Sequence, residues 1–175
     1  MFQPFGIMLK GFAHLRLNKV NEAEIYLSAL KTKATDPELE EQKIWGLNSF
    51  KSIVNIAALV LEGEILAAKK NYDQAIQLLN EAVQKEDALT YQEPFDWYHP
   101  VRQTLGAVLL EAGKSAQAEN VFKEDLKMYR NNGWSLFGLS QSLEKQGKKK
   151  ESAATMKLYK KAFKNADVQL ISARK

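Results

Sequence analysis

Cysteine is absent from the 175 residues, and histidine occurs only twice. Without thiols the chain forms no disulfide, no zinc–thiolate site and no thiol nucleophile. A histidine-based metal site would need carboxylates to complete its ligands. His14 and His99 are far apart in the sequence, and neither belongs to an HxxxH or ExxH pairing. We therefore expect no metal and no cofactor.

Proline and glycine are scarce, with four and nine residues, and no run of about 18 apolar residues exists. We therefore expect no membrane span. The first residues lack a basic leader, a long apolar core and a small-residue cleavage site, so they do not form a signal peptide. A composition of 45% hydrophobic and 26% charged residues fits one soluble globular unit. The expected location is the cytoplasm by default. If the chain is a fragment of a longer, exported protein, its sequence does not indicate the location.

A spacing of two small residues, twelve positions apart, recurs four times along the chain. The pairs are Gly11–Ala23, Gly63–Ala75, Gly106–Ala118 and Ser140–Ser152, and each is followed four residues later by Leu27, Leu79, Phe122 or Met156. Small residues let two antiparallel helices approach closely, and the large side chain fills the space beside the contact. A hairpin of this kind cannot bury its apolar face alone, so stacked copies share one core.

The third and fourth units are 34 residues apart, and this helix–turn–helix pattern resembles the tetratricopeptide repeat. "LGAVLLEAGKSAQAENVF" and "NYDQAIQLLNEAV" carry the resemblance. The segment "EPFDWYHPVRQTLGAVLLEAG", followed by "GWSLFGLSQSLEKQGK", is similar to the C-terminal part of long bacterial tetratricopeptide-repeat proteins of unassigned function. The resemblance implies an all-α, right-handed α-solenoid of about four helix–turn–helix hairpins with two insertions.

The expected domain is one solenoid over residues 1–175, more than two thirds helical and without β-sheet. Its units are expected at about 4–34, 49–87, 99–131 and 133–166, with turns near Asn18, Asn71, Gly113 and Gly147. The units are separated by 52 residues and then 43 before the 34-residue spacing, which places inserted segments at about 36–48 and 88–98. We expect the second helical unit to begin near Asn48 or Ser49, and a tail at 167–175.

A concave groove is the expected site for a partner, because the first helix of each unit lines it in such solenoids. The lining residues are expected to be Met8, Phe12, Val60, Glu64, Gln103, Ala107, Trp134, Phe137 and Gln141. This apolar floor with amide groups suits an amphipathic helix or an extended hydrophobic peptide. It would equally suit burial against other parts of a longer parent protein. The Lys, Asn and Arg residues with which related domains clamp chaperone tails are absent from these positions, so that activity is not implied.

No nucleophile, base and orienting group converge in the pattern, so we expect no catalytic residues and no enzyme activity. The Trp97-Tyr98-His99 cluster is interpreted as an anchor that pins the inserted loop, with Trp97 mostly buried, rather than as a ligand site. Arg102 and Asp125 are expected to form a buried ion pair inside the third unit, the alternative being an anion site at Arg102.

Charge gives an alternative function. The net charge is +4, and the segment from Lys145 onward has ten Lys or Arg and two acidic residues, so that it carries +8 and the first 144 residues −4. Such asymmetry is compatible with a module that binds RNA or another polyanion through the basic C-terminal helix. Nucleic-acid sites usually add stacking aromatics, and here the nearby rings are expected to face the core. The favoured role is therefore a non-catalytic scaffold or adaptor that binds a protein or peptide of unknown identity.

The two ends of the solenoid are expected to differ. Val168, Leu170 and Ile171 follow the last helix and are expected to fold back over Tyr159 and Phe163 as a cap. At the other end, Phe2, Phe5, Ile7 and Met8 would face a missing neighbour. Internal repeats expose an apolar side to the next repeat. We therefore expect self-association, further repeats or a partner at the N-terminal end.

Overall fold

Helices make up 70% of the computed structural model, which describes residues 3–174. The helices are α1 (Gln3–Arg16), α2 (Val20–Ala34), α3 (Glu38–Glu41), α4 (Phe50–Ala68), α5 (Tyr72–Asp87), α6 (Val101–Glu111), α7 (Ser115–Met128), α8 (Gly133–Lys145) and α9 (Lys149–Ala162). Two short strands, β1 (Lys43–Ile44) and β2 (Asn48–Ser49), lie between α3 and α4. The predicted fold class, an all-α solenoid, is confirmed.

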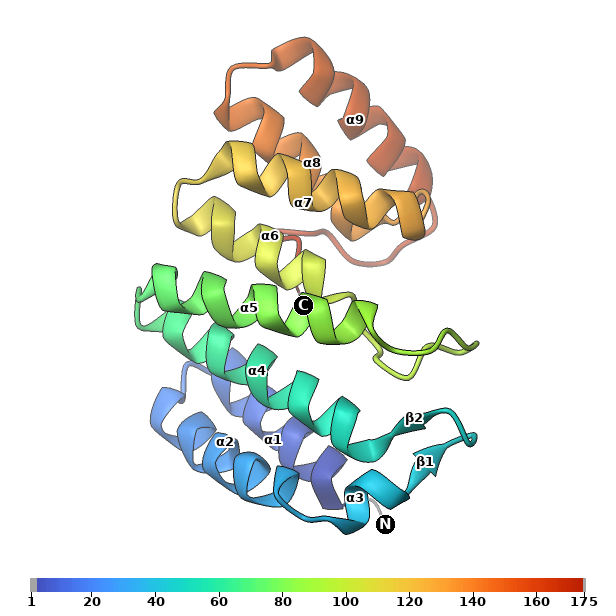
Figure 1. Cartoon of the computed structure of the whole chain (residues 1–175). Coiled ribbons are helices and arrows are strands. Elements are labelled where there is room, and N and C mark those ends of the chain that lie inside the picture. Colours follow the sequence, from blue (N-terminus) through green and yellow to red (C-terminus); the bar gives the residue numbers. More distant parts are fainter. Residues whose placement is uncertain (1–2, 175) are drawn as a thin grey trace. The chain divides into compact units, whose positions relative to one another are not determined.

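The chain divides into two compact units, one ending at His99 and the other beginning at Pro100. In the first unit α1 pairs with α2 and α4 with α5, and α2 also packs on α4 (Figure 1). In the second unit α6 pairs with α7 and α8 with α9, while α7 packs on α8. Each unit is therefore a pair of stacked helical hairpins. A single continuous domain over 1–175 stays a prediction.

Glycines let the paired helices approach closely, as the sequence spacing predicted. A Cβ atom at Gly106 would lie 2.4 Å from the ring of Phe122, and one at Gly138 would lie 2.3 Å from the same ring. Phe122 is fully buried, so its ring fills the space that both glycines leave open. Gly63 meets Leu79 in the same way, at 2.8 Å. The small–large pairing therefore sets the distance between helices in both units.

The four hairpin turns lie where the sequence predicted them, and each contains a residue in the left-handed region. These residues are Asn18, Lys70, Gly113 and Gly147, with φ between 57° and 76°. Glycine adopts this conformation without a steric penalty, and asparagine tolerates it better than most residues. The turns thus end one helix and start its partner within three residues.

The first insertion contains a small β-hairpin, so the prediction that no β-sheet would be present is wrong. β1 and β2 pair antiparallel, with Lys43 opposite Ser49 and Ile44 opposite Asn48. Trp45 and Gly46 form the turn with φ values of 50° and 79°, and the Leu47 N–H donates to the Ile44 carbonyl at 2.9 Å. Positive φ at both central positions is the geometry that two antiparallel strands favour. The hairpin then leads directly into α4, whose N-cap is Ser49, as predicted.

Asn48 joins the first insertion to the second. Its amide nitrogen donates to the Thr90 carbonyl at 2.8 Å and to the Asp96 carboxylate at 2.7 Å, while its oxygen accepts from the Thr90 N–H at 2.8 Å. Asn48 is 7% exposed, so these hydrogen bonds are largely shielded from water. Trp97, close to Asp96, is 4% exposed, which confirms the prediction that it is buried. The two insertions therefore form one connected feature of the first unit.

Asp125 is buried inside the second unit, but its hydrogen bonds differ from the ion pair predicted with Arg102. Its Oδ2 accepts from the Ser135 hydroxyl and from the Gln103 amide at 3.3 Å, while Oδ1 has no hydrogen-bond partner. Burial raises the pKa of Asp125, and the positive charge of Arg102 lowers it by a smaller effect. Two neutral polar side chains, Gln103 of α6 and Ser135 of α8, therefore hold this carboxyl group.

Candidate functional site

In the first unit, the predicted groove residues lie in the interior. Met8, Phe12, Val60 and Glu64 are all 9% exposed or less. The Glu64 carboxylate pairs with Arg16, whose second guanidinium nitrogen donates at 3.0 Å. Desolvation of the Tyr98 hydroxyl and the nearby negative charge of Glu64 raise the pKa of Tyr98. The end of the second insertion therefore lies near this side of α4, where the sequence suggested an open surface.

In the second unit, the predicted groove residues of α6 are buried as well. Gln103 is fully buried and Ala107 is 3% exposed. Gln103 uses its amide nitrogen for Asp125, and its oxygen has no hydrogen-bond partner. These two residues support the interior of the unit. A partner cannot reach them without first displacing other parts of the chain.

The remaining predicted groove residues, on α8, are accessible. Trp134, Phe137 and Gln141 are each partly exposed. Trp134 contacts Phe163, with ring centroids 4.9 Å apart, and Phe137 contacts Tyr159 at 5.3 Å. Tyr159 and Phe163 also touch, at 5.1 Å. Together with Gln141 and Met156, these four rings form what we call the α8–α9 surface.

A hollow in the same hairpin shares Gln141 and Met156 with this surface. It has a volume of about 310 Å³ and is lined from α8 by Ser140, Gln141 and Glu144 and from α9 by Lys149, Ser152, Ala153 and Met156. Large aromatic side chains with a polar edge are the residues that most often dominate protein–protein contacts. The pairing of the rings depends on Gly133, because a Cβ atom there would lie 1.8 Å from Phe163. The sequence signal for this surface is therefore a glycine followed by Trp134 at the start of α8.

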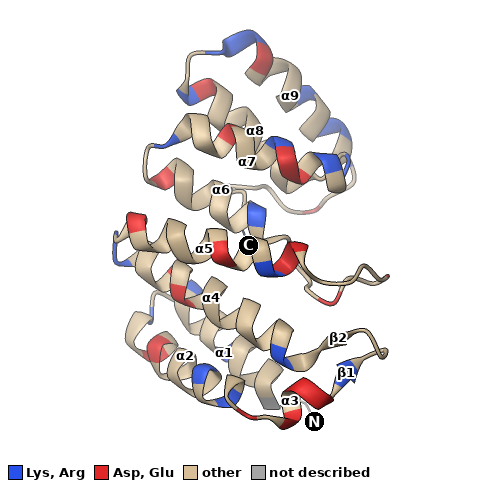
Figure 2. Ribbon diagram, viewed as in Figure 1, with Lys and Arg blue, Asp and Glu red and all other residues tan. Residues whose placement is uncertain are grey.

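Exposed lysines lie along α9. They include Lys149, Lys157, Lys160 and Lys161, and Figure 2 shows several Lys and Arg positions on this helix. Nearby, Lys123 and Lys148 donate to Glu119 at 2.6 and 2.7 Å, and they hold the pKa of Glu119 at about 2. The second unit has a net charge of +8, against −4 for the first. An acidic partner is therefore attracted to this unit and repelled from the other.

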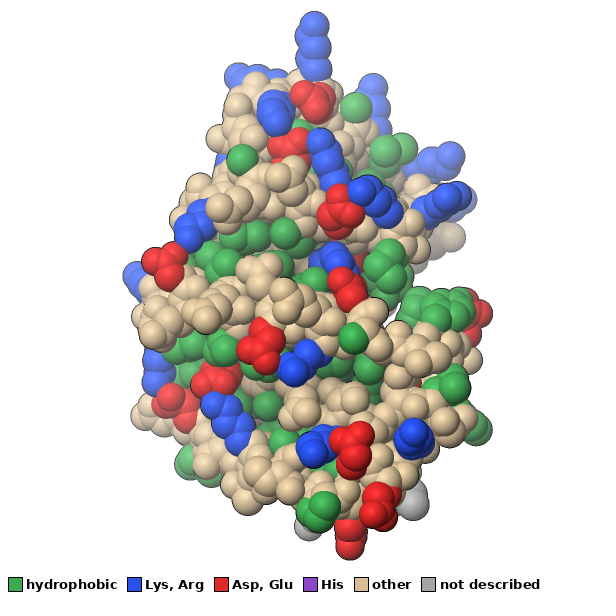
Figure 3. Space-filling model, viewed as in Figure 1, with side chains coloured by type: hydrophobic (Ala, Val, Ile, Leu, Met, Phe, Trp, Pro, Cys, Tyr) green, Lys and Arg blue, Asp and Glu red, His purple; other side chains and the backbone are tan. Residues whose placement is uncertain are grey.

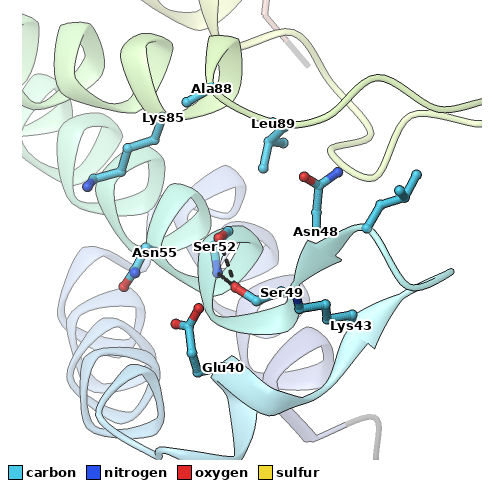
Figure 4. A pocket seen from close by; sticks show the side chains of 10 residues that line it. Glu40, Lys43, Asn48, Ser49, Ser52, Asn55, Lys85, Ala88 and Leu89 are labelled. Carbon is cyan, nitrogen blue, oxygen red and sulfur yellow. Dashed lines mark hydrogen bonds between the residues drawn. The ribbon is translucent and has the colours of Figure 1, made fainter.

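A polar pocket of about 320 Å³ lies in the first unit, where the β-hairpin meets α4 and the end of α5 (Figure 4). Its lining includes Lys43 and Lys85 together with Ser49, Ser52 and Asn55. The hydroxyls of Ser49 and Ser52 hydrogen bond to each other at 2.9 Å, and Ser49 also accepts from the Ser52 N–H at 3.2 Å. Ser49 is the N-cap of α4, and Ser52 lies in the first turn of that helix. The sequence did not predict the pocket, because its lining residues come from separate segments of the chain.

Exposed apolar side chains also gather on the two insertions. Trp45 is 84% exposed, and Leu47, Tyr91 and Phe95 are between 43% and 66% exposed. Tyr91 and Phe95 meet edge to face at 5.5 Å. Figure 3 shows hydrophobic side chains on the projecting second insertion. The sequence did not predict this feature, because the segments have no helical period and the positive φ of Trp45 is visible only in the structure.

The two histidines are structural neighbours of aromatic rings. His14 stacks on Tyr26 with ring centroids 5.2 Å apart, and Tyr98 lies between Trp97 and His99 at 5.2 and 6.2 Å. Over residues 3–174, no group of three His, Cys, Asp or Glu side chains is arranged to hold a metal ion. Within the same residues, no helix is both long enough and apolar enough to cross a membrane.

Comparison with known proteins supports the fold. The chain matches no protein-family model and no curated protein sequence. Among solved structures, MamA from AMB-1, which contains tetratricopeptide repeats, aligns with a TM-score of 0.51 and 17% identity over 95% of each chain. A second crystal form of MamA from AMB-1 gives a TM-score of 0.49 and 19% identity over 93% of this chain and 99% of that one. The first likeness shows a helical-repeat fold.

Proposed function

We propose that this protein is a non-catalytic protein-binding module of the tetratricopeptide type, acting as a scaffold or adaptor. The α8–α9 surface is the observation that carries the proposal. It is the part of the predicted groove that stays accessible, and it combines four touching aromatic rings with a hollow between two helices. An amphipathic helix fits such a surface, with its apolar side on the rings. Acidic residues at its edges would face the lysines of α9.

The helical-repeat fold supports this proposal because repeat proteins commonly present extended binding surfaces. The resemblance to the C-terminal part of bacterial tetratricopeptide-repeat proteins implies an alternative, in which the chain is one part of a longer repeat protein. In that case further helices would cover part of the same surface. The partner proposed here is a separate protein or peptide. The experiment below uses the chain without further repeats, so any protein that the chain retains is a separate molecule.

The test compares two variants that carry the same new charge. Gln141→Arg places a cation inside the α8–α9 surface, whereas Ala116→Arg places it at an exposed position of α7. Each immobilised protein is exposed to extract from the source cells, and the retained proteins are identified by mass spectrometry. We expect that at least one protein is retained by the wild-type chain and by Ala116→Arg but is not retained by Gln141→Arg. Equal retention by all three would overturn the proposal.

The basic surface of α9 favours a second function, binding of RNA or another polyanion. Five lysines lie on this helix and all are exposed, and its only acidic residue is Glu151; the lysines are Lys149, Lys150, Lys157, Lys160 and Lys161. Salt separates the two functions, because polyanion binding releases counterions and weakens steeply with ionic strength. A ligand held by the aromatic rings should lose little affinity between 50 and 200 mM salt, an interval over which about six phosphate contacts would cost roughly a thousandfold.

Self-association through the N-terminal end also stays a proposal. Phe2 lies outside the described residues, but Phe5 packs edge-on against Phe50 at 5.9 Å and Met8 is 4% exposed. These residues therefore have neighbours within the first unit, contrary to the expectation that they face an absent repeat. Leu9 and Ile25 are 58% and 67% exposed and would provide the contact instead. Sedimentation at increasing concentration tests this, and a monomer throughout the range would exclude it.

A further inference from the structure

A groove runs along α4 within the first unit, and two adjoining hollows form it. One is the polar pocket of about 320 Å³ in Figure 4, the other has a volume of about 380 Å³, and Asn55 and Lys85 line both. Figure 3 shows hydrophobic side chains in the recess between α2 and α5. Val60 and Glu64, which the sequence predicted to line a concave groove, lie on a different face of α4. We call the two hollows together the α4 groove.

The floor of the α4 groove is one row of side chains on a single helix. Ser52, Asn55, Leu59 and Glu62 line it at spacings of three or four residues, and all four are partly exposed. Ten residues of helix separate the first of them from the last, which corresponds to about 15 Å. An extended chain rises about 3.3 Å per residue. The row therefore has room for about five residues of an extended peptide.

The side-chain amide of Asn55, near the middle of this row, is not used by the fold. In the part of the chain that the structure describes it makes no hydrogen bond, whereas the buried Asn48 makes three. An amide group has both a donor and an acceptor, so it can exchange two hydrogen bonds with one peptide unit. An extended chain has backbone N–H and C=O groups free for this exchange, but a helix uses its own internally. Asn55 therefore favours an extended ligand over a helical one.

The β-hairpin end of the α4 groove favours a negative charge. Lys43 and Lys85 both line the hollow there, and Lys43 makes no ion pair with any residue between 3 and 174. Lys85 contacts Glu81 at 3.6 Å, and both of these side chains are about half exposed, so that contact is weak. Glu40 also lines the hollow, but it lies 3.7 Å from Lys51. A carboxylate of a ligand is therefore attracted to the space near the two lysines.

The other end of the α4 groove is neutral and partly apolar. Lys31 of α2 pairs with Glu62 of α4 at 2.7 Å, so their charges cancel. Ala58 and Leu59 line the same hollow and offer a contact for an apolar side chain. Along α4, Leu59 lies seven residues beyond Ser52, or about 10 Å. This distance equals about three residues of an extended chain.

We propose that the α4 groove binds an extended segment of another protein in which an acidic residue stands three positions from an apolar one. The acidic side chain lies near Lys43 and Lys85, a peptide unit beyond it exchanges two hydrogen bonds with Asn55, and the apolar side chain packs on Leu59. This site belongs to the first unit, so the proposal does not depend on the α8–α9 surface.

The test selects peptides from a displayed library of random hexapeptides on the immobilised full chain. Peptides that also bind Asn55→Ala are removed, which eliminates ligands of the α8–α9 surface. We expect the retained sequences to place Asp or Glu three residues from Leu, Ile, Val, Met or Phe. Retained sequences without this spacing would overturn the proposal, as would a library that yields no peptide specific to the wild-type chain.

Matched variants then test the lysine and the amide with one selected peptide. Lys43→Glu should weaken binding at least tenfold, whereas Lys10→Glu, at an exposed position of α1, changes the net charge equally and should bind as wild type does. Asn55→Ala should weaken binding about tenfold because two hydrogen bonds are lost, whereas Asn120→Ala, at an exposed position of α7, should not. Equal losses within either pair would contradict the assignment.

Nuclear magnetic resonance of the isotope-labelled chain locates the bound peptide. The amide signals of Ser52 and Leu59 should shift when the peptide, with both ends blocked, is added. Shifts confined to α8 and α9 would overturn the proposal. The same shifts with acetate alone would assign the groove to a small anion, and the same shifts on concentrating the protein alone would assign it to a second copy. Either result would exclude the extended segment as the ligand.

Discussion

Replacing Gly106 by alanine tests whether small residues set the helix spacing of the second unit. The new Cβ atom would lie 2.4 to 2.8 Å from three carbon atoms of the Phe122 ring. Because carbon atoms pack best at about 3.5–4.0 Å, the ring must move by about 1 Å. The ring cannot move toward α8, because it already occupies the space where a Cβ atom of residue 138 would lie. The strain must therefore spread into the backbone of α6 or α7.

The expected magnitude is the difference between two opposing effects. Overpacking a close-packed core costs about 1–3 kcal/mol, and the upper end applies because the fully buried Phe122 is confined on both sides. Alanine is the better helix former by about 1 kcal/mol. We therefore expect Gly106→Ala to lower the free energy of unfolding by about 2 kcal/mol, or to lower Tm by roughly 4–8 °C. Replacing Phe122 by leucine in the same protein should recover part of this loss.

Gly6→Ala is the matched control. This glycine is exposed in α1, and a Cβ atom there would have no neighbour within 4 Å. Only the helix-propensity gain remains, so the variant should be more stable than wild type by about 0.5–1 kcal/mol. Urea unfolding followed by far-ultraviolet circular dichroism measures both proteins. Shifts of the same sign for Gly106→Ala and Gly6→Ala would refute the close-approach argument.

Three further predictions concern polar residues. Asn48→Ala removes three hydrogen bonds between the insertions, so amide hydrogen exchange at Thr90 should accelerate while exchange in α4 stays unchanged. Burial raises the pKa of Asp125 in the folded protein, so the protein loses stability as pH rises through the raised pKa. Asp125→Asn should therefore be more stable than wild type at pH 7. A lower stability of Asp125→Asn at that pH would contradict this prediction. Glu119 has the opposite sign: its pKa of about 2 means that its contribution is lost as pH falls from 4.5 to about 2. Glu119→Gln should accordingly flatten the acid limb of the stability curve, which urea titrations between pH 5 and 2 would measure.

The hairpins could be predicted from the sequence because helices impose a period on their residues. Gly106, Ala118 and Phe122 occupy positions that only an antiparallel helix pair brings together, and the structure shows that contact. Trp97 could be predicted as buried because exposing a large ring to water is costly. Helical spacing and the burial of large apolar side chains depend on residue type and on one helix pair. Both can therefore be predicted from a single sequence.

The irregular segments could not be predicted in the same way. Residues 167–174 and the two insertions have no period, and their positions depend on specific side-chain contacts, among them Arg174 with Glu111 and Asn48 with Thr90. The predicted cap over Tyr159 and Phe163 is not what residues 167–174 form, because Val168 and Ile171 are 53% and 92% exposed. The same limitation affects the groove. Helical spacing correctly placed Gln103 and Ala107 on one face of α6, but spacing carries no information about what else covers that face. Gln103 and Ala107 were therefore expected to line an accessible groove, whereas both are buried.

Site-specific cross-linking from position 141 tests the proposed binding surface most directly. The chain has no cysteine, so Gln141→Cys and Ala116→Cys each accept one photoreactive maleimide at a known place. The α8–α9 surface predicts that a protein retained by the wild-type chain forms a covalent adduct with the label at 141 and not with the label at 116. The adduct should form again when the purified partner replaces the extract. Adducts of equal yield from both positions, or from 116 alone, would contradict the account.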